Sequence, residues 1–381
     1  MSDINIKETI EDKKSWFNIK RFKIGQIDFE KPEKSIDSKF LKKDDEIKDL
    51  KFIETSKEIN RFEAIEAIHS TQDNKKEVDN FFNKKEWNNK PHIINLTFGF
   101  NPENFIKNQD KRNVLVGLLD YYQEYSNFIN SVPNLKISKF NPETKKNETK
   151  INVEGYIKFV DFAYKTLQTK NSKPIFAPIS LKFSQKDLLT LIKHYIKKEI
   201  FYYWVDFEGR SINLYSLGKL RFLSNMIKRE GFYDKSIMYF SNINREIISN
   251  PMDTKSPASD VLSPLAGANI IGVNRKPRRV IPKSKNTDYE KIKLSKENKI
   301  RILDIKSYYY VKQNIEPIQE KDCVIKNAIN LEQEFEEQAQ NLLNNKDINS
   351  FLQQKTMLNS YKNGQILKGI ESKEDKKSKW Y

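Results

Sequence analysis

Between residues 174 and 274 the chain repeats one pattern of apolar and polar positions. A short run of consecutive apolar residues is followed by a polar turn and then by a segment with apolar residues at helical spacing. The apolar runs lie at 175–180, 201–206, 237–241 and 268–273, and the amphipathic segments between them include 184–198 and 214–229. Strands that are apolar at successive positions are typical of a parallel sheet covered on both faces. The pattern therefore predicts consecutive βα units.

The same pattern extends to both sides of this region. We expect about eight strands, which begin near Ser35, Ile93, Leu135, Ile175, Phe201, Ile237, Ala268 and Ile300. Eight βα units close into a (β/α)8 barrel of the TIM type, and this is the α/β architecture that we predict. A doubly wound open sheet is the alternative.

Flanking segments complete the predicted organisation. Residues 22–29 alternate apolar and polar positions, which favours an N-terminal hairpin before the first barrel strand. Residues 56–69 have apolar residues at three-residue steps and are predicted to form a helix. We place a barrel domain at 16–316 and a C-terminal helical extension at 317–367, between a disordered N-terminus at 1–15 and a charged tail at 368–381. The apolar stripe of the C-terminal helices is expected to pack on the barrel or on another subunit, either a second copy or a partner.

Composition narrows the class of protein and of partner. The 381 residues carry a formal net charge of +16, which attracts polyanions such as nucleic acid. Lys is abundant together with Asn and Ile, as an AT-rich coding sequence also produces, so codon bias is the alternative cause. The N-terminus is charged, and no run approaches the roughly 18 apolar residues that a membrane span needs. Because the chain has one cysteine, a disulfide framework is excluded and we expect a cytoplasmic protein.

In a (β/α)8 barrel the active site lies at the carboxyl ends of the strands, so the polar residues that close each apolar run are the candidates. Asp206 closes one run and is followed by Glu208, and a carboxylate at an apolar rim has a tunable pKa. An ordinary strand-end cap is the alternative. Asp304 closes the last run, where it could be a nucleophile, a general base or a salt-bridged structural acid. Asn242 follows another run and is a candidate for substrate binding.

The segment after residue 267 carries the most unusual chemistry. Asn269 and Gly272 lie in a short predicted strand, where Gly272 permits close approach of the backbone to a ligand. Four cations follow in one loop and could clamp phosphates. They are Arg275, Lys276, Arg278 and Arg279. A solvated run of surface charge is the alternative.

Motifs for nucleotides and metals are missing from the sequence. It contains no Walker motif, no Gly-rich dinucleotide fingerprint and no paired metal-ligand spacing. One cysteine cannot form a multi-cysteine zinc site, and the three histidines, His69, His92 and His194, do not end predicted strands. The sequence therefore predicts neither a bound metal nor a cofactor.

Two segments resemble the tRNA-guanine transglycosylase (tRNA-ribosyltransferase) superfamily. Residues 22–25 and 33–37 are similar to the N-terminal hairpin and first barrel strand of that family. Residues 267–272, before a loop with Pro277 and Arg278, are similar to its Gly-hydrophobic-Asp-x-x-Asp segment and the following loop. Family members are TIM barrels that exchange a base in a nucleic acid for a deazaguanine. The resemblance covers about 22–310 and implies that fold and that activity.

The chain departs from the family at the residues that carry its chemistry. Asn269 and Gly272 stand where the family has two acids, one of them the nucleophile. The Ser-Gly-Gly motif is absent after Gly99, and the family's zinc site of three cysteines and one histidine cannot be built from Cys323 alone. The resemblance then implies either that base exchange was lost or that the nucleophile moved, with Asp304 or Asp206 as the substitute.

Two functions follow from these observations. In the first, the chain is a transglycosylase-like enzyme that acts on a base in tRNA or DNA; Asp206 recognises the base edge, Asp304 is the nucleophile, and the loop 275–279 holds the phosphate backbone. In the second, the chain is a catalytically inactive barrel that binds nucleic acid or an active partner subunit. A TIM-barrel enzyme for a small anionic substrate is a third interpretation.

Overall fold

The structure is a computed structural model of the whole chain. It describes residues 4–359, except for 13–14, 16, 42–49, 72–74, 83–89, 102–105, 142–145, 150, 170–172, 245–253, 275–300, 313–319 and 346. The loop with Arg275, Lys276, Arg278 and Arg279 therefore lies outside the described residues, as does the charged tail 368–381.

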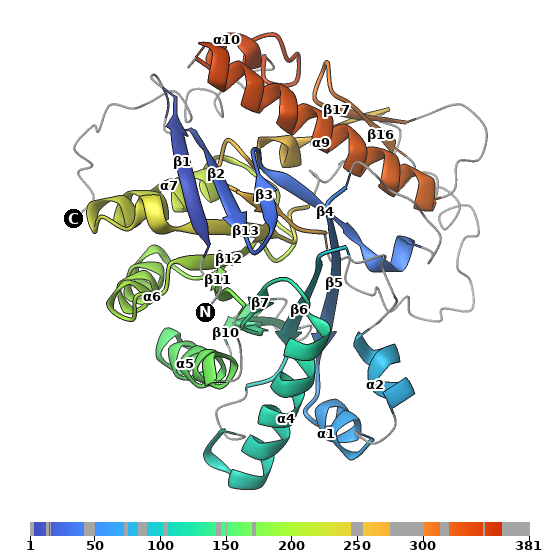
Figure 1. The fold of residues 1–381 in the computed structure, drawn as a ribbon, viewed down its shortest axis with the longest axis vertical. Coiled ribbons are helices and arrows are strands. Elements are labelled where there is room, and N and C mark those ends of the chain that lie inside the picture. Colours follow the sequence, from blue (N-terminus) through green and yellow to red (C-terminus); the bar gives the residue numbers. More distant parts are fainter. Residues whose placement is uncertain are drawn as a thin grey trace.

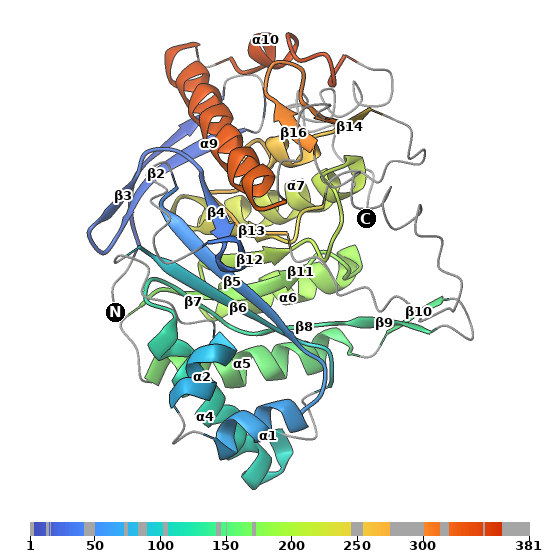
Figure 2. The ribbon, with the colours of Figure 1, turned by 90° about the vertical axis from the view of Figure 1, so that its right-hand side faces the viewer.

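A curled parallel sheet of nine strands forms the centre of the molecule (Figures 1 and 2). Its order is β7–β11–β12–β13–β15–β4–β5–β6–β8. The strands are β4 (Glu33–Asp37), β5 (Phe52–Ile59), β6 (His92–Phe98), β7 (Asn130–Ser131), β8 (Asn134–Leu135), β11 (Ile175–Ser180), β12 (Tyr202–Asp206), β13 (Ile237–Ser241) and β15 (Ile270–Ile271). Neighbouring strands of this sheet pair in parallel wherever the structure describes them. The predicted α/β class with a parallel sheet is confirmed.

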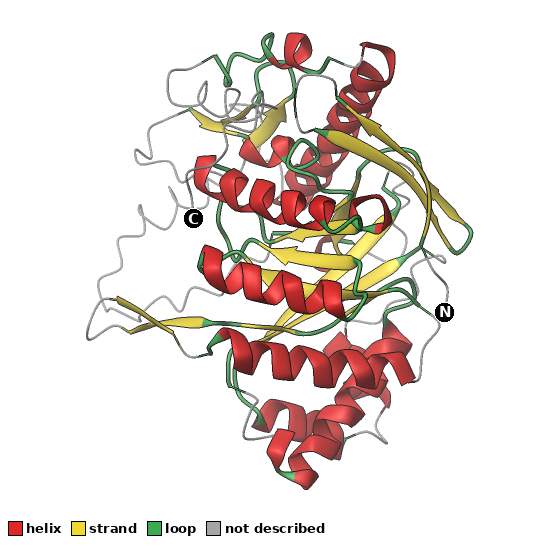
Figure 3. Ribbon diagram, turned by 90° about the vertical axis from the view of Figure 1, so that its left-hand side faces the viewer, coloured by secondary structure: helices red, strands yellow, loops and turns green. Residues whose placement is uncertain are grey.

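Helices lie along the outside of the sheet. They are α1 (Glu63–Ser70), α2 (Lys75–Phe82), α4 (Gln109–Tyr125), α5 (Val153–Thr169), α6 (Gln185–Lys197), α7 (Leu214–Arg229), α9 (Glu320–Asn345) and α10 (Asn349–Leu352), with short 3-10 turns η1 (Ser38–Phe40), η2 (Tyr233–Lys235) and η3 (Ser259–Leu262). In Figure 3, α5, α6 and α7 run side by side along the strands. None of the helices in the described part of the chain is long and apolar enough to cross a membrane.

Helix α7 shows how the sequence sets a boundary locally. Asn213 accepts a hydrogen bond from Ser216 N at 3.0 Å, and the Ser216 hydroxyl accepts one from Asn213 N at 2.9 Å, which together form a capping box. This pair satisfies backbone donors that the first helical turn leaves unpaired. Leu217, Leu220 and Leu223 then follow at helical spacing and are buried against the sheet.

Alternate positions of strands β12 and β13 pack into different hydrophobic clusters. Tyr203 and Val205 face the helices, whereas Trp204 belongs to an inner cluster with Phe176 and Tyr239. The curled sheet therefore has an outer face covered by helices and an inner face filled by its own side chains. This alternation also sets which strand-end residues face inwards, because a side chain two positions along a strand lies on the same face.

The amino ends of the strands are covered by an antiparallel sheet of β1 (Asn5–Glu11), β2 (Asn18–Ile24) and β3 (Ile27–Phe29). Phe29 stacks on Phe22 at 4.3 Å and on Phe52, the first residue of β5, at 5.2 Å between ring centroids. The predicted N-terminal hairpin is present. Residues 5–11, which we expected to be disordered, form its additional strand β1 because Ile4 and Ile10 are buried in the packing.

A second antiparallel sheet lies beside α9. It consists of β14 (Lys255–Pro257), β17 (Tyr309–Lys312) and β16 (Arg301–Asp304), and a separate hairpin joins β9 (Ser138–Asn141) to β10 (Lys146–Thr149). Asn327 of α9 accepts a hydrogen bond from Leu303 N at 2.7 Å and donates one to Arg301 O at 2.8 Å. These bonds fix β16 on the helix.

Three predicted elements differ from the structure. Residues 56–59 belong to β5 rather than to the predicted helix 56–69, because polar residues fill the inner positions of β5 and hide its alternation. The run near Ile300 forms β16 in the antiparallel sheet and is not a strand of the central sheet. Of the residues described between 348 and 359, only Asn349–Leu352 are α-helical.

Candidate functional site

Polar side chains gather at the carboxyl ends of neighbouring strands. Ser180 of β11, Asp206 of β12 and Ser241 of β13 are partners in the strand register, so they lie side by side across the sheet. Asp206 is two positions after the inward-facing Trp204 and therefore shares its face. The carboxyl ends of parallel strands are where α/β proteins bind ligands.

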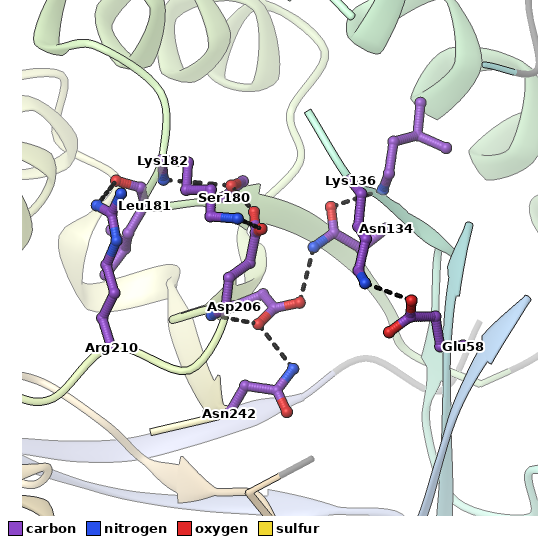
Figure 4. Close-up of polar contacts among 11 residues, drawn as sticks. Glu58, Asn134, Lys136, Ser180, Leu181, Lys182, Asp206, Arg210 and Asn242 are labelled. Carbon is purple, nitrogen blue, oxygen red and sulfur yellow. Dashed lines mark hydrogen bonds and ion pairs between the residues drawn. The ribbon is translucent and has the colours of Figure 1, made fainter. Parts of the chain in front are cut away.

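Asp206 is buried and held by three N–H donors (Figure 4). Its Oδ2 accepts a hydrogen bond from Asn134 Nδ2 at 2.9 Å, and its Oδ1 accepts bonds from Asn242 Nδ2 and Glu208 N, both at 2.8 Å. In the close-up, the carboxylate lies between Asn134 and Asn242. The arrangement presents donors to both oxygens, as an anionic carboxylate requires when it is taken out of water.

The orientation of the Asn134 amide follows from its other contacts. Its Oδ1 accepts hydrogen bonds from the Tyr156 hydroxyl at 2.6 Å and from Leu135 N at 2.8 Å. Because donors face the amide oxygen, the amide nitrogen has to face Asp206. The side chain therefore acts as a fixed donor to the carboxylate.

Glu208 lies beside Asp206 in a different environment. Its Oε2 is 2.8 Å from Lys182 Nζ, and its Oε1 accepts a hydrogen bond from the Ser180 hydroxyl. Only 3% of the Glu208 side chain is exposed, compared with 25% for Lys182. Burial raises the pKa of the Glu208 carboxyl, the charge of Asp206 raises it further, and Lys182 acts in the opposite direction. A carboxyl group in this state is suited to proton transfer.

Backbone geometry directs these side chains. Glu208 and Asn242 have positive φ angles of 48° and 56°, and Gly209 has 79°. Gly209 N donates to Asn242 O at 2.9 Å, which joins the two strand ends. A positive φ is costly for residues with a side chain and is concentrated at functional sites. Here it turns the chain after β12 so that Glu208 meets Ser180 and Lys182.

A second ion pair lies across the cluster. Lys136, two positions after Asn134, is paired with Glu58 at the end of β5, and their side chains are 30% and 19% exposed. Arg210 is held on the other side by a hydrogen bond of 3.0 Å from its Nη1 to Leu181 O. The polar cluster therefore has accessible cations at its edge.

Below the cluster, Glu54 is buried on the inner face of the sheet. It accepts hydrogen bonds from Ser35 Oγ at 2.8 Å, Asn95 Nδ2 at 2.9 Å and Val273 N at 2.8 Å. Burial raises the pKa of its carboxyl. A Cβ atom on Gly272 would lie 2.7 Å from Glu54 Oε2, so the carboxylate occupies the space that a side chain at position 272 would need.

The structure brings together three of the predicted site residues: Asp206, Glu208 and Asn242. Asn269 is elsewhere, since its Oδ1 accepts a hydrogen bond of 2.9 Å from Met238 N and joins β13 to the segment before β15. Gly272 packs on Glu54 and lines a separate cavity.

Asp304 is not at an end of the central sheet, because β16 belongs to the antiparallel sheet. Its carboxylate accepts hydrogen bonds from Lys306 N at 3.1 Å and from the Ser307 hydroxyl. These bonds stabilise the turn between β16 and β17. The expectation that Asp304 closes a barrel strand was therefore wrong.

Three residues of the cluster were missed or undervalued by sequence reasoning. Asn134 lies in the short strand β8 and Lys136 follows it, in a segment whose apolar signal is weak, and Glu54 comes after only two apolar residues of β5. Residues 54–58 of β5 are polar without a break, so no alternation of apolar and polar positions marked Glu54 in the sequence. Within the described residues, no group of three or more His, Cys, Asp or Glu side chains is arranged to hold a metal ion.

No protein-family model and no curated protein matches the sequence of this chain.

Proposed function

We propose that this chain is a glycosyl-transfer enzyme that acts on a base in nucleic acid and that its active site is the cluster around Asp206 and Glu208. The observation that supports it best is the pair of adjacent carboxyl groups in unlike environments. Asp206 faces three N–H donors, whereas Glu208 has a raised pKa and a lysine partner. Paired carboxyl groups with separate roles are the machinery of glycosidic-bond chemistry.

The proposal includes closure of the sheet into a (β/α)8 barrel. Its two outer strands, β7 and β8, are separated only by Val132 and Pro133. β7 pairs with β11 at one edge, and β8 pairs with β6 at the other. We infer that residues 130–135 act as one strand that joins the two edges, which would make eight strands in total. The Asp206 cluster would then lie at the mouth of the barrel.

Each carboxyl group has a separate role in the proposed exchange. Glu208 gives its proton to a nitrogen of the departing base while the bond between that base and C1′ of the sugar breaks. The Asp206 carboxylate bonds to C1′ and forms a glycosyl ester. The incoming base attacks C1′, breaks the ester and returns a proton to Glu208, which restores both groups. Asp206 thus replaces the nucleophile of the family, whose two acids are Asn269 and Gly272 in this chain.

The substrate class rests on charge and on hydrogen-bonding groups. Asn242 and Ser180 place polar atoms beside the two carboxyl groups for recognition of a base edge, and Lys136 with Arg210 lies where phosphates of a nucleic acid would approach. The formal net charge of +16 supports a polyanionic substrate.

One observation favours a second function, a catalytically inactive barrel that binds nucleic acid. Asp206 is buried and both its oxygens already accept hydrogen bonds, as in a purely structural carboxylate. In that case the same cations bind nucleic acid but no base is exchanged.

Incorporation of labelled guanine into bulk tRNA and into duplex DNA tests the proposal. Glu208→Gln is expected to lower kcat roughly 100-fold or more, and Asp206→Asn at least as much, while binding of tRNA at two salt concentrations is retained. Asp304→Asn is the matched control, because it makes the same change on the antiparallel sheet, and its exchange rate should stay within about twofold of the wild type.

The outcomes separate the two functions. Salt-dependent tRNA binding without exchange by the wild type would support the inactive barrel. Loss of exchange in Asp304→Asn but not in Asp206→Asn would overturn the assignment of the nucleophile. Absence of both binding and exchange would reject both nucleic-acid functions and leave a small anionic substrate.

A further inference from the structure

A cavity of about 280 Å³ lies between the ends of β4 and β15 and helix α9. Its lining includes Gly272 and Asn274 but neither Asp206 nor Glu208, so it is distinct from the cluster described above. Cavities of about 150 Å³ already admit a benzene ring. This cavity therefore has room for one ring-sized molecule with a substituent.

One wall of the cavity is apolar. Val324, Ala328 and Leu331 line it from α9, and Phe40 and Ile243 line it from the sheet side. These side chains favour a ligand with a flat apolar ring, because its binding removes apolar surface of both the ring and the wall from water.

The polar part of the cavity contains an acceptor without a donor. Asp260 of η3 accepts a hydrogen bond from the Tyr310 hydroxyl at 2.6 Å through Oδ2. Its Oδ1 is buried and has no hydrogen-bond partner among the described residues. A buried acceptor left unpaired costs free energy, so a ligand that donates an N–H here gains that free energy.

The other charged groups of the lining are already paired. Asp37 accepts a hydrogen bond from Lys39 N at 3.1 Å and forms an ion pair with Lys39 Nζ at 2.6 Å. Lys34 Nζ donates to Gly272 O and, at 3.1 Å, to Ser35 O. Because two main-chain carbonyls hold the Lys34 ammonium, it is poorly placed to receive an anionic ligand.

We propose that this cavity binds a small aromatic amidine or amine, whose N–H donors bond to Asp260 Oδ1 and whose ring packs against Val324, Ala328 and Leu331 of α9. The site is independent of the proposed exchange reaction. An amidine presents two N–H groups in the plane of its ring and suits a carboxylate acceptor next to an apolar wall.

Titration calorimetry of the full chain with benzamidine tests this site, with toluene and benzoate as probes of similar size. Benzamidine should bind, and toluene, which lacks donors, should bind more weakly. Benzoate should bind least, since it presents an anion to Asp260. Equal or tighter binding of toluene or benzoate would overturn the proposal, and so would failure of benzamidine to bind.

Two variants locate the binding. Asp260→Asn keeps an acceptor for the Tyr310 hydroxyl and removes the charge, so benzamidine affinity should fall roughly 10- to 100-fold. Glu336→Gln, on the exposed face of α9, is the matched control and should leave the affinity unchanged. Unchanged affinity in Asp260→Asn would contradict the proposal.

A separate readout does not depend on Asp260. Cys323 is the single cysteine of the chain, is buried and lines the cavity. Saturating benzamidine should slow the reaction of this thiol with a maleimide, and Ala328→Phe, which fills the cavity, should abolish benzamidine binding. Binding that persists in Ala328→Phe would place the ligand elsewhere and overturn the proposal.

Discussion

The two ends of the central sheet are built from opposite kinds of residue. At the amino ends, Phe22, Phe29 and Phe52 stack in a closed aromatic cluster under the β1–β3 sheet. At the carboxyl ends, the side chains facing inwards are carboxylates, amides and lysines. The amino end gains its stability from apolar burial, whereas the carboxyl end buries charge at a cost in stability. The difference supports the proposal that the carboxyl end carries the chemistry, whereas the amino end stabilises the fold.

The largest expected effect on stability is at the amino end. Phe29→Ala removes a fully buried ring that stacks on three others, so it should lower the free energy of unfolding by about 3–5 kcal/mol. Urea denaturation followed by circular dichroism measures this loss. Ser180→Ala, at the opposite end, is the comparison and should cost roughly 1 kcal/mol. Similar losses for the two variants would contradict the division between the ends.

A pH effect of opposite sign at each end sharpens the comparison. At the amino end, burial lowers the pKa of Lys20 to about 7 from 10.5. Its contribution to stability is present above pH 10.5 and is lost as the pH falls through 7. Relative to Lys20→Met, the wild type should therefore lose up to about 1.4 kcal/mol of unfolding free energy for each pH unit as the pH falls from 10.5 to about 7.

Glu208 supplies the contrast at the carboxyl end. Its pKa is raised from 4.5, so its contribution to stability is present below pH 4.5 and is lost as the pH rises through its folded value. Glu208→Gln should remove this decrease of the unfolding free energy with rising pH, whereas Lys20→Met should leave the decrease in place. Urea denaturation of both variants and the wild type from pH 4.5 to 10 measures the two slopes. Slopes of the same sign would show that burial does not control these two groups.

A smaller effect is expected inside the sheet, between the two ends. Gly272→Ala places a Cβ 2.7 Å from Glu54 Oε2 and 2.8 Å from the Tyr239 hydroxyl, so it should cost about 1–3 kcal/mol. Glu54→Ala in the same chain should relieve part of this cost, with a coupling energy of about 1 kcal/mol in a double-mutant cycle. Additive effects of the two changes would show that Glu54 does not compete for the space at position 272.

Much of the local structure could be predicted because its signal is local. Helix α7 and strand β13 have the predicted bounds, 214–229 and 237–241, since apolar spacing and capping residues are close in sequence. Strand β5 could not be predicted from local spacing. Glu54 faces the buried interior, but polar residues surround it in the sequence, so no apolar pattern shows that this position is buried. The same limit explains why Glu54 was absent from the candidate residues.

The candidate site was predicted in part for a related reason. Asp206 and Glu208 follow directly from an apolar run, so their position at a strand end could be inferred. Asn134, a partner of Asp206, lies in β8, 72 positions away, and Lys182, the partner of Glu208, lies in the turn after β11, 26 positions away. Only strand order and register bring these residues together.

The sequence by itself determined that the chain forms βα units, that it is strongly basic and that Asp206 closes a buried strand, because each property depends on residue type and near neighbours. The tertiary structure decided that the run at 301–304 leaves the central sheet and that Glu208 meets Lys182. It also decided that Glu54 fills the space beside Gly272. Pairing of distant strands depends on the packing of the whole chain, and no local pattern of residues records it.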